Sequence, residues 1–521
     1  MVEAIRNVHR SPLRVVIVGG GTAGWMSAAA IRRRLRPEDY AVTLIESDDI
    51  GTVGVGEATL PHIKIFNDML GLDEAQFMRE TRATFKIGIQ FCDWDRPGEG
   101  YIHPFGAFGE PWGGVEFQHH WVRALQARRQ QYSLQDYSYA VVAARNNAFE
   151  FPNEDKKSIR STYAYAYHFD AGLYAAYLRT WALERGVRRI EGQVCDVKRN
   201  PTSGDVQELT LKSGERIAGD LFIDCSGFRS LLLGGVMEVA WRDWTHWLPC
   251  DRALAMPTPR SAGALTPYTR STARRGGWMW RIPLQHRTGN GYVFSSQFIS
   301  EDDARDELVA ALGGTAPAQP RLLRFSPGRR EHAWRGNCVA IGLASGFLEP
   351  LESTSIYLIQ AAVTDLINLM PRPGAAPDPR LMNEFNRLND MQYERIRDFL
   401  VLHYTANRRI GEPLWDYVRS MPLPDSLAHK LALFRARATV PNYHYGLFAR
   451  DSWLSVLLGQ GIMPEGHDRL ADAFPIDTLE ERLAELRGRI QTNVDAMTAH
   501  GEFIANYCGP AETMASEKVA V

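Results

Sequence analysis

The stretch that decides the fold spans residues 14–24 and reads RVVIVGGGTAG. Its first half is a short β-branched run typical of a buried parallel strand, and its second half opens an alanine-rich helix that we expect to reach residue 31. Glycines at this spacing permit a tight turn, a close backbone approach to a pyrophosphate, and close helix packing. We therefore assign a phosphate-binding loop to Gly19, Gly21, Thr22, Ala23 and Gly24.

The residues after this loop support the same interpretation. A second apolar run at residues 41–45 ends in Glu46, where an acid can accept hydrogen bonds from ribose hydroxyl groups. The helix N-terminus supplies free amides and the positive end of a helix dipole to an anion. A glycine-rich turn without a ligand is the alternative, and the order strand, loop, helix, strand, acid disfavours it. The sequence predicts an α/β fold with a Rossmann-type nucleotide-binding module.

Length and composition place the chain among ordinary globular proteins. At 521 residues it exceeds the size at which one hydrophobic core keeps growing, so we expect two or more modules. It is 45% hydrophobic and 23% charged, and 59 basic residues against 61 acidic ones give a formal charge of −2. This balance offers nucleic acid no large basic surface, and we interpret the short basic cluster at residues 32–34 as a solvated helix face.

The cysteines and the N-terminus bear on the cellular compartment. The six cysteines are scattered, without the close spacing of a metal site or a disulfide framework, which fits reduced thiols. Residues 1–14 lack the apolar run of a signal peptide, and no run of about 18 apolar residues follows. We expect a cytoplasmic protein without a membrane segment. His119 and His120 are adjacent and would diverge on a helix, so we predict no metal site.

Features of a nucleotide-binding module recur far along the chain. Residues 188–197 resemble the strand of such modules whose backbone meets the adenine, and we expect buried apolar strands at residues 221–227 and 339–344. From residue 381 the pattern turns helical, and one apolar stripe is made by Leu479, Leu483, Leu486, Ile490, Val494 and Met497. The predicted division is a discontinuous cofactor module at 1–95, 156–235 and 326–375, and an inserted aromatic-rich substrate module with C-terminal helices at 96–155, 236–325 and 376–521.

Three short motifs carry more chemical information than the fold. They are TFKIG at residues 84–88, WMWRIP at 278–283 and LEPLESTSI at 348–356. Together they resemble the flavin-dependent halogenases of the tryptophan halogenase family, and the resemblance extends from Gly19 to about Trp453. It implies a glutathione-reductase-like FAD-binding fold with reduced FAD as cosubstrate. The implied enzyme uses dioxygen and a halide ion, chloride or bromide, to form hypohalous acid that halogenates an indole-type aromatic substrate.

The resemblance makes Lys86 the catalytic residue that delivers the active halogen. An ammonium group is a compact donor that can hydrogen-bond hypohalous acid, and an amine can form a haloamine. The neighbouring Phe85 and Ile87 would make its surroundings apolar. Taken alone, a lysine between hydrophobic residues is usually a surface residue whose aliphatic stem is covered.

The motif at 348–356 supplies the acid that the chemistry needs. Attack by positive halogen makes the aromatic ring cationic, and a carboxylate beside it lowers that barrier and can remove the proton. By resemblance Glu352 is this carboxylate and Ser353 is its catalytic neighbour. Thr354 and Ser355, at the start of a helix expected to reach residue 361, would hold the halide, because helix N-termini favour anions. The alternative is that Ser353 or Thr354 caps the helix.

The tryptophan motif is expected to form a strand with Trp278 and Trp280 on one face. In the family this motif, completed here by Ile282 and Pro283, lies beside the flavin and keeps the organic substrate away from it. Simple core packing is the alternative, since bulky aromatic residues do that well. The resemblance implies further flavin contacts at Ala58, Val194 and Leu343.

The substrate residues depart from those of enzymes that act on free tryptophan. His103 and Phe105 resemble the pair that sandwiches an indole, and Trp453 would supply a further wall. Free-tryptophan enzymes also carry a Tyr-Tyr pair followed by Glu, which grips the amino-acid groups. The corresponding stretch here reads YHY at 443–445 and RDSW at 450–453, a poor match. We therefore expect an indole without the amino-acid moiety, or an indole within something larger, and we expect free indole or a simple derivative to be halogenated at the electron-rich pyrrole-ring carbon.

Two other functions stay open. An aromatic hydroxylase would use the same reduced flavin and dioxygen, but Leu343 stands where such enzymes usually carry Asp, and the tryptophan motif also argues against it. A flavin-binding protein without turnover would not need Lys86 and Glu352. Because we find one dinucleotide fingerprint and no second one for a nicotinamide cofactor, we expect a separate NAD(P)H-dependent flavin reductase as partner. A homodimer is also open.

Overall fold

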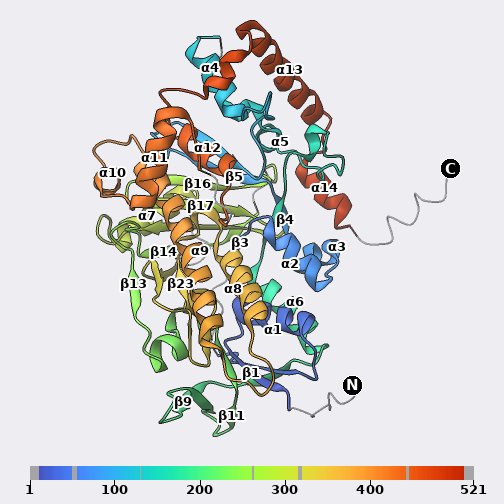
Figure 1. Cartoon of the computed structure of the whole chain (residues 1–521), viewed down its shortest axis with the longest axis vertical. Helices are drawn as coiled ribbons and strands as arrows, with labels where there is room; N and C mark the ends of the chain where they lie inside the picture. The colour runs from blue at the N-terminus through green and yellow to red at the C-terminus, as the bar shows by residue number, and fades with distance from the viewer. Residues whose placement is uncertain are drawn as a thin grey trace, which may run out of the picture.

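Two large β-sheets and a set of C-terminal helices make up the molecule. The computed structural model describes residues 11–49, 56–129, 131–260, 263–314, 319–441 and 445–509. Figure 1 shows the first sheet, with β1 (Leu13–Val18), near one end of the long axis, and α4 (Phe117–Gln126) and α13 (Ile476–Asp495) near the other. The second sheet lies between these two ends.

The first sheet has the nucleotide-binding arrangement. Its order is β21 (Trp334–Arg335), β22 (Cys338–Ala340), β12 (Leu221–Asp224), β1, β2 (Tyr40–Glu46) and β8 (Arg188–Glu191). Neighbouring strands pair in parallel, except for the antiparallel pair β21 and β22. Val15 and Ile17 face one hydrophobic core while Val16 and Val18 face another. Strand β1 is therefore buried on both faces, as its β-branched sequence predicts.

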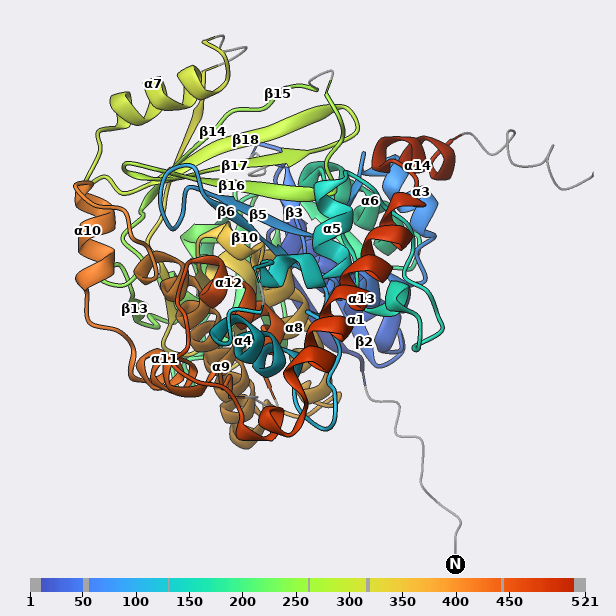
Figure 2. The same cartoon turned by 90° about the horizontal axis from the view of Figure 1, so that it is seen from above.

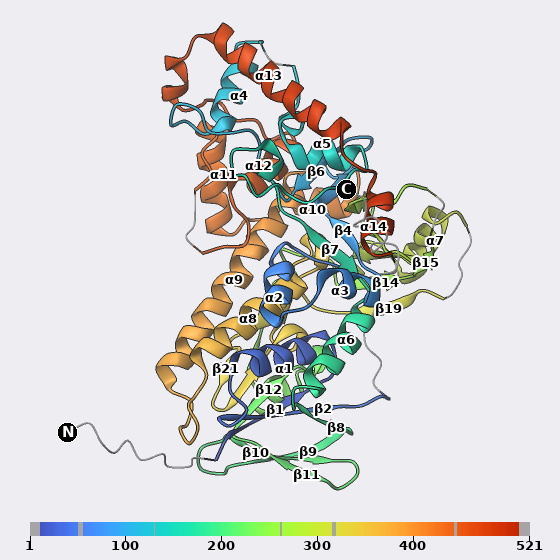
Figure 3. The ribbon, with the colours of Figure 1, turned by 90° about the vertical axis from the view of Figure 1, so that its right-hand side faces the viewer.

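Helices cover one face of this sheet and a small antiparallel sheet covers the other. Figure 3 shows α1 (Thr22–Arg34), α6 (Ala171–Leu183) and α8 (Ser355–Leu369) on one side, and the strands β9 (Val194–Arg199), β10 (Val206–Leu211) and β11 (Arg216–Ala218) on the opposite side. Both α1 and α8 continue beyond the ends expected from sequence, residues 31 and 361.

The prediction of one strand at residues 188–197 is wrong in its extent. Two strands occupy this range, because β8 belongs to the parallel sheet and β9 to the antiparallel one. The chain changes sheets at Gly192, whose backbone N–H donates to Glu46 O. A Cβ at residue 192 would lie 2.9 Å from Leu211 Cδ1, so the close approach of β10 favours glycine there.

The second sheet is mostly antiparallel. Its order is β19 (Arg321–Arg324), β14 (Arg252–Ala255), β18 (Arg287–Phe294), β17 (Gly277–Pro283), β16 (Tyr268–Arg274), β5 (Gly88–Cys92) and β6 (Gly100–Pro104), with β15 (Thr258–Pro259) beside β18. Figure 2 shows α7 (Glu301–Ala311) on its outer side. Met279 packs into the core under α7, whereas Trp278 and Trp280 face the main core. The predicted alternation along this strand is confirmed.

Short elements connect the two sheets. Strands β3 (Glu57–Ala58), β7 (Ala166–Phe169) and β4 (Thr84–Lys86) form a three-stranded sheet, in which Lys86 pairs with Ala166. A second small sheet contains β13 (Trp241–Asp243), β20 (Gly328–Arg330) and β23 (Gly346–Phe347). The helices α2 (His62–Leu70), α3 (Glu74–Glu80) and α5 (Tyr139–Arg145) complete this part of the chain.

The C-terminal part is helical, as predicted. It contains α9 (Pro379–Thr405), α10 (Pro413–Ser420), α11 (Asp425–Arg437), α12 (Arg450–Gly459), α13 and α14 (His500–Tyr507). The stripe expected on α13 is buried at Leu479, Leu483, Ile490 and Val494, while Leu486 is partly buried and Met497 lies beyond the helix end. Within the described ranges, none of the helices is long and apolar enough to span a membrane.

The division into a cofactor and a substrate module stays a prediction. Strand β5, which falls in the first cofactor segment, pairs in parallel with β16 of the second sheet. Chain segments from both predicted modules therefore contribute to that sheet.

Candidate active site

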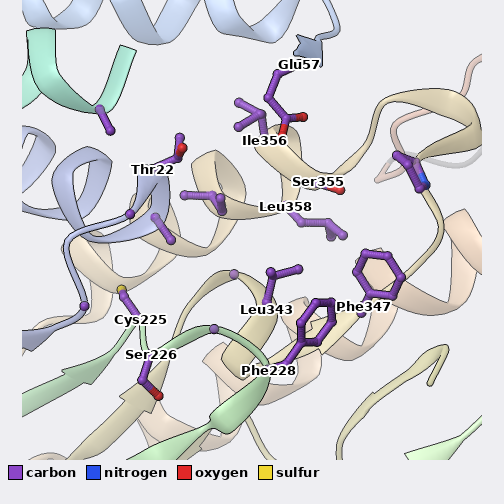
Figure 4. A pocket seen from close by; sticks show the side chains of 18 of the residues that line it. Thr22, Glu57, Cys225, Ser226, Phe228, Leu343, Phe347, Ser355, Ile356 and Leu358 are labelled. Atoms are coloured by element: carbon purple, nitrogen blue, oxygen red, sulfur yellow. The ribbon is translucent and has the colours of Figure 1, made fainter. Parts of the chain in front are cut away.

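A large cavity lies between the glycine loop and the second sheet. Its volume is about 660 Å³, a size typical of sites for small organic ligands. Figure 4 shows side chains around it that come from different elements, among them Thr22 of α1, Ser226 after β12, and Ser355 of α8. The cofactor residues predicted from sequence that line it are Gly19, Gly21, Thr22, Ala23, Glu46, Ala58, Val194 and Leu343.

The glycine loop fits the phosphate groups of a dinucleotide. Gly19 has a φ of +115°, and a Cβ there would lie 2.2 Å from Cys225 O. A Cβ at Gly24, which packs behind the cavity, would lie 1.8 Å from Gly19 O. Gly21 caps α1 without any side-chain hydrogen bond, so the first amides of the helix remain available to an anion. The loop can therefore hold the pyrophosphate of FAD.

Glu46 lies at the cavity edge in a network of its own. Trp25 Nε1 donates to Glu46 Oε2 at 3.1 Å, and Arg189 Nε donates to Oε1 at 2.5 Å. Arg179 places a further guanidinium nitrogen 3.5 Å from Oε1. Each carboxylate oxygen has two lone pairs, so these contacts orient the group and still leave room for a ribose hydroxyl. Ribose binding by Glu46 stays a prediction.

The tryptophan motif lines the same cavity and is tied to the motif at 348–356. Trp278, Trp280 and Ile282 line the cavity, and the two indole rings are 6.3 Å apart. Trp278 Nε1 donates to Glu349 Oε2 at 2.9 Å. Pro283 does not line the cavity, but its carbonyl accepts the Thr84 hydroxyl at 2.7 Å. Two of the three sequence motifs are therefore joined by a hydrogen bond between side chains.

Lys86 is fully buried at the end of β4. Its Nζ donates to Thr59 O and to Ser353 Oγ, each at 2.9 Å, and lies 4.9 Å from the centre of the Phe105 ring. Burial lowers the pKa of Lys86 to about 7, although the negative charge of Glu352 acts in the opposite direction. Near neutral pH the amine can therefore be present in both protonation states.

Glu352 is fully buried between two histidines. His103 Nδ1 lies 2.9 Å from Oε2 and 3.0 Å from Oε1, and His403 Nε2 lies 2.8 Å from Oε1. Burial alone would raise the pKa of Glu352, but the charge and hydrogen bond of His103, with those of His403, lower it to about 2. The group is therefore a carboxylate at neutral pH.

The three residues after Glu352 connect it to the cavity. Ser353, at φ +60°, accepts the hydrogen bond from Lys86 and also lines the cavity. Thr354 is the N-cap of α8, yet it makes no side-chain capping bond. Among the described residues its buried Oγ1 has no hydrogen-bond partner. The alternative of a side-chain cap is therefore not observed at Thr354, and a free hydroxyl at a helix N-terminus that borders the cavity fits an anion.

The predicted substrate residues are only partly brought together. His103 and Phe105 meet edge to face, with their rings 6.4 Å apart. Trp453 of α12 contacts neither of them directly in the described structure; it packs on Phe399, whose ring is 5.7 Å from His103. The Lys430 ammonium lies 3.9 Å from the Trp453 ring centre. The grip expected of free-tryptophan enzymes falls partly on residues 442–444, which lie outside the described residues.

Three residues of the site, His403, Tyr404 and Glu349, are not predicted from the sequence. His403 and Tyr404 are neighbours on the long helix α9 and belong to no motif. Tyr404 donates to Glu349 Oε2 at 2.8 Å, beside the bond from Trp278. Burial raises the pKa of Glu349 to about 7, against the effect of these two donors. Glu349 lies inside the motif at 348–356. Its position three residues before Glu352 is the one sequence signal that could have identified it as a site residue.

Comparison with known proteins adds to this geometry. The pattern of the family described as tryptophan halogenase matches residues 14–476. The chain is 34% identical over 523 residues to tryptophan 6-halogenase SttH of Streptomyces toxytricini, with 95% of this chain and 98% of the relative covered. It is 32% identical over 535 residues to tryptophan 7-halogenase RebH of Lentzea aerocolonigenes, with 95% and 99% covered.

Solved structures extend the likeness to three dimensions. The flavin-dependent halogenase BrvH from Brevundimonas sp. BAL3 superimposes with a TM-score of 0.91 at 43% identity, covering 95% of this chain and 99% of that one. The flavin-dependent halogenase Xcc4156 from Xanthomonas campestris gives a TM-score of 0.91 at 45% identity, covering 96% and 99%. The α/β fold, the parallel sheet and the C-terminal helices predicted from sequence are confirmed.

Proposed function

Since this chain belongs to the tryptophan halogenase family and is a flavin-dependent halogenase, we propose a division of labour among its residues. Lys86 receives hypohalous acid made from chloride or bromide, and Glu352 stabilises the cationic ring of an indole-type substrate and takes its proton. When bound, reduced FAD supplies the electrons with which dioxygen becomes able to oxidise the halide. The hydroxylase alternative is not favoured by these relatives.

One observation carries this proposal: the hydrogen bond from Lys86 Nζ to Ser353 Oγ. Ser353 lines the cofactor cavity, and the next residue toward the N-terminus is Glu352. This contact supports a role for the lysine near both the cavity in which the oxidant would form and the carboxylate at which the ring would react. The burial of Lys86 also excludes bulk water, into which hypohalous acid would otherwise diffuse away.

The halide is proposed to bind at the start of α8. The free Thr354 hydroxyl, the Ser355 side chain in the cavity and the positive end of the helix dipole support this. The remaining cofactor residues, Ala58, Val194 and Leu343, are proposed to contact FAD because they line the cavity.

The proposed substrate is an indole without a free amino-acid group. Several relatives are named as tryptophan halogenases, whereas BrvH and Xcc4156, which share more identity, are described as flavin-dependent halogenases. The poor match at 443–445 and 450–453 supports the same preference. His103, Phe105 and Trp453 are proposed as its aromatic walls.

Partners and location are proposed on related grounds. A separate NAD(P)H-dependent flavin reductase would supply reduced FAD, because the chain carries one dinucleotide fingerprint. Reduced thiols support a cytoplasmic location, since all six cysteines are free. A homodimer is also proposed, and a measurement of molecular size in solution tests it.

The test is a product assay with the purified enzyme, a flavin reductase, FAD, NADH, air and indole. Separate reactions contain bromide, chloride or neither halide, and mass spectrometry reads the products. We expect haloindole with the isotope pattern of the halide supplied and no product without halide. Hydroxyindole formed equally in all three reactions would contradict the proposal.

A further inference from the structure

His403 is a buried histidine beside the proposed catalytic carboxylate. It lies on α9, is 0% exposed, and is packed against the rings of Phe91, Trp94 and Phe399. Its Nε2 is 2.8 Å from Glu352 Oε1, in a close but oblique contact. No motif identified in the sequence includes it.

The hydrogen-bond partners of the ring decide where its protons are. His403 Nδ1 lies 2.7 Å from Phe399 O, and a carbonyl oxygen can only accept, so Nδ1 carries a hydrogen. A neutral imidazole has one N–H, which would leave a bare lone pair on Nε2. Two acceptors 2.8 Å apart repel each other in a buried site. One of the two groups, His403 or Glu352, must therefore carry a further proton.

The groups around Glu352 decide which partner holds that proton. His103 of β6 faces both carboxylate oxygens from another side. Its charge and its hydrogen bond lower the pKa of Glu352 and so favour an ionised carboxylate. On the side of His403, the packed rings carry no charge, and the adjacent Tyr404 turns to Glu349.

We propose that His403 is a positioning residue, whose imidazolium holds Glu352 ionised and fixed in orientation through a buried ion pair. The inference rests on the proposed role of Glu352. Because the ring is enclosed, His403 acts through the carboxylate rather than on the substrate. An imidazolium at this place keeps the charge of Glu352 available where the cationic ring would form, so no reorganisation is needed when it does.

The protonation state can be measured without turnover. The protein is labelled with ¹³C at histidine Cε1, and the His403 signal is identified among the 14 histidines by its loss in His403→Gln. Should that variant not fold, His403→Phe serves the same purpose. We expect the imidazolium chemical shift for His403 at pH 8 in the wild-type enzyme, and the neutral shift in Glu352→Gln. A neutral His403 in the wild-type enzyme at pH 8 overturns the inference.

A kinetic arm separates positioning from packing. In single turnovers, His403→Gln should lower the halogenation rate by roughly tenfold to a hundredfold with little change in KM. It should also shift the acid limb of the rate to higher pH than in the wild type, because the carboxylate loses a partner that favours its ionised form. The exposed His429→Gln is the matched control and should behave as wild type. A uniform loss of rate at all pH values would mean a merely structural role and overturn the inference.

The two proposals fail in different ways. If His403 is an imidazolium but Glu352→Gln halogenates at the wild-type rate, the ion pair stands and the catalytic role of Glu352 fails. If His403 is neutral while Glu352→Gln is inactive, the role of Glu352 stands and the inference about His403 fails.

Discussion

The amino group of Lys86 donates to two acceptors and has one further position for a hydrogen bond. Thr59 O and Ser353 Oγ take two of its N–H groups. In the ammonium form a third N–H remains for hypohalous acid, and in the amine form a lone pair remains for a haloamine. A limb near pH 7 in the rate of halogenation, absent from the flavin reaction, would follow from either form. If the halogenation rate falls as pH rises through 7, the ammonium form is the active one. If the rate rises over the same range, the active form is the amine.

The burial of Lys86 should cost stability. Its pKa is lowered in the folded protein from 10.5 to about 7, so the unfolded chain binds more protons between these values. The cost is fully present below pH 7 and disappears as pH rises toward 10.5. We predict that Lys86→Met raises the free energy of unfolding by roughly 1–4 kcal/mol at pH 6 and by less at pH 10. Denaturant titration of both chains measures it.

The control for this prediction is Lys156→Met, which removes an exposed lysine. This substitution should change the free energy of unfolding by less than about 0.5 kcal/mol at both pH values. A destabilised Lys86→Met at pH 6 would show that the ammonium contributes more through its hydrogen bonds than it costs in burial.

Replacing Glu352 by Gln keeps the size of the side chain and removes its charge. Loss of one preorganised electrostatic group typically costs on the order of a hundredfold in rate. We predict that loss in single-turnover halogenation, with FAD affinity unchanged because Glu352 does not line the cavity. The exposed Glu502→Gln serves as control. A loss below about threefold would place the stabilising charge elsewhere.

At the residue scale, sequence reasoning identifies groups that belong to recognisable motifs. Gly19 and Gly24 could be assigned because only glycine tolerates their close contacts. His103 was identified as an aromatic wall, but its bond to Glu352 depends on β6 meeting the loop before α8, which no local pattern encodes. His403 could not be found, because one histidine in a helix of 27 residues carries no signal by itself.

At the scale of elements, adjacent residues of α9 bind the two acids of the motif at 348–356. His403 contacts Glu352, and Tyr404 donates to Glu349, which also accepts from Trp278 of β17. This network joins a helix, a strand and the loop before α8. It fixes the position of Glu352 relative to the cavity that Trp278 lines.

We predict that Glu349 is held at a cost in stability. Its pKa is raised to about 7, so stability is lost as pH rises from about 4.5 through 7. Glu349→Gln can still accept from both Trp278 and Tyr404, and should raise the free energy of unfolding by roughly 1–3 kcal/mol at pH 8 but not at pH 4.5. Glu349→Leu, which removes the acceptor, should instead destabilise at both pH values.

Sequence patterns predict elements with strong periodicity, but they do not predict where the chain passes from one sheet to another. The alternation in WMWRIP predicted β17 correctly, and the stripe on α13 appears where expected. The range 188–197 is predicted as one strand because it resembles a strand of nucleotide-binding modules. The change of sheet at Gly192 depends on contact with Leu211, a residue far along the chain.

At the scale of the whole molecule, the site is built by segments that are distant in sequence. The glycine loop and α8 supply the cavity, while β4, β6 and α9 bring Lys86, His103 and His403 around Glu352. Substrate choice depends on this assembly, because a zwitterion without polar partners loses roughly 1–3 kcal/mol per unpaired group.

We therefore predict that indole is halogenated in preference to free tryptophan. Both compounds are supplied at equal concentration in one reaction, and mass spectrometry compares haloindole with halotryptophan. Separate reactions with each compound control for a difference in intrinsic reactivity. A clear excess of halotryptophan would show that the protein does supply partners for the amino-acid groups.

Lys86 is proposed to pass the halogen from the cofactor cavity to the substrate. The most direct test compares wild type with Lys86→Ala, using reduced FAD, air, bromide and indole, with methionine present to consume any oxidant that escapes. We predict bromoindole from the wild type, and from Lys86→Ala a loss of about a hundredfold or more with FAD affinity unchanged. Bromoindole at the wild-type rate from Lys86→Ala would contradict the claim.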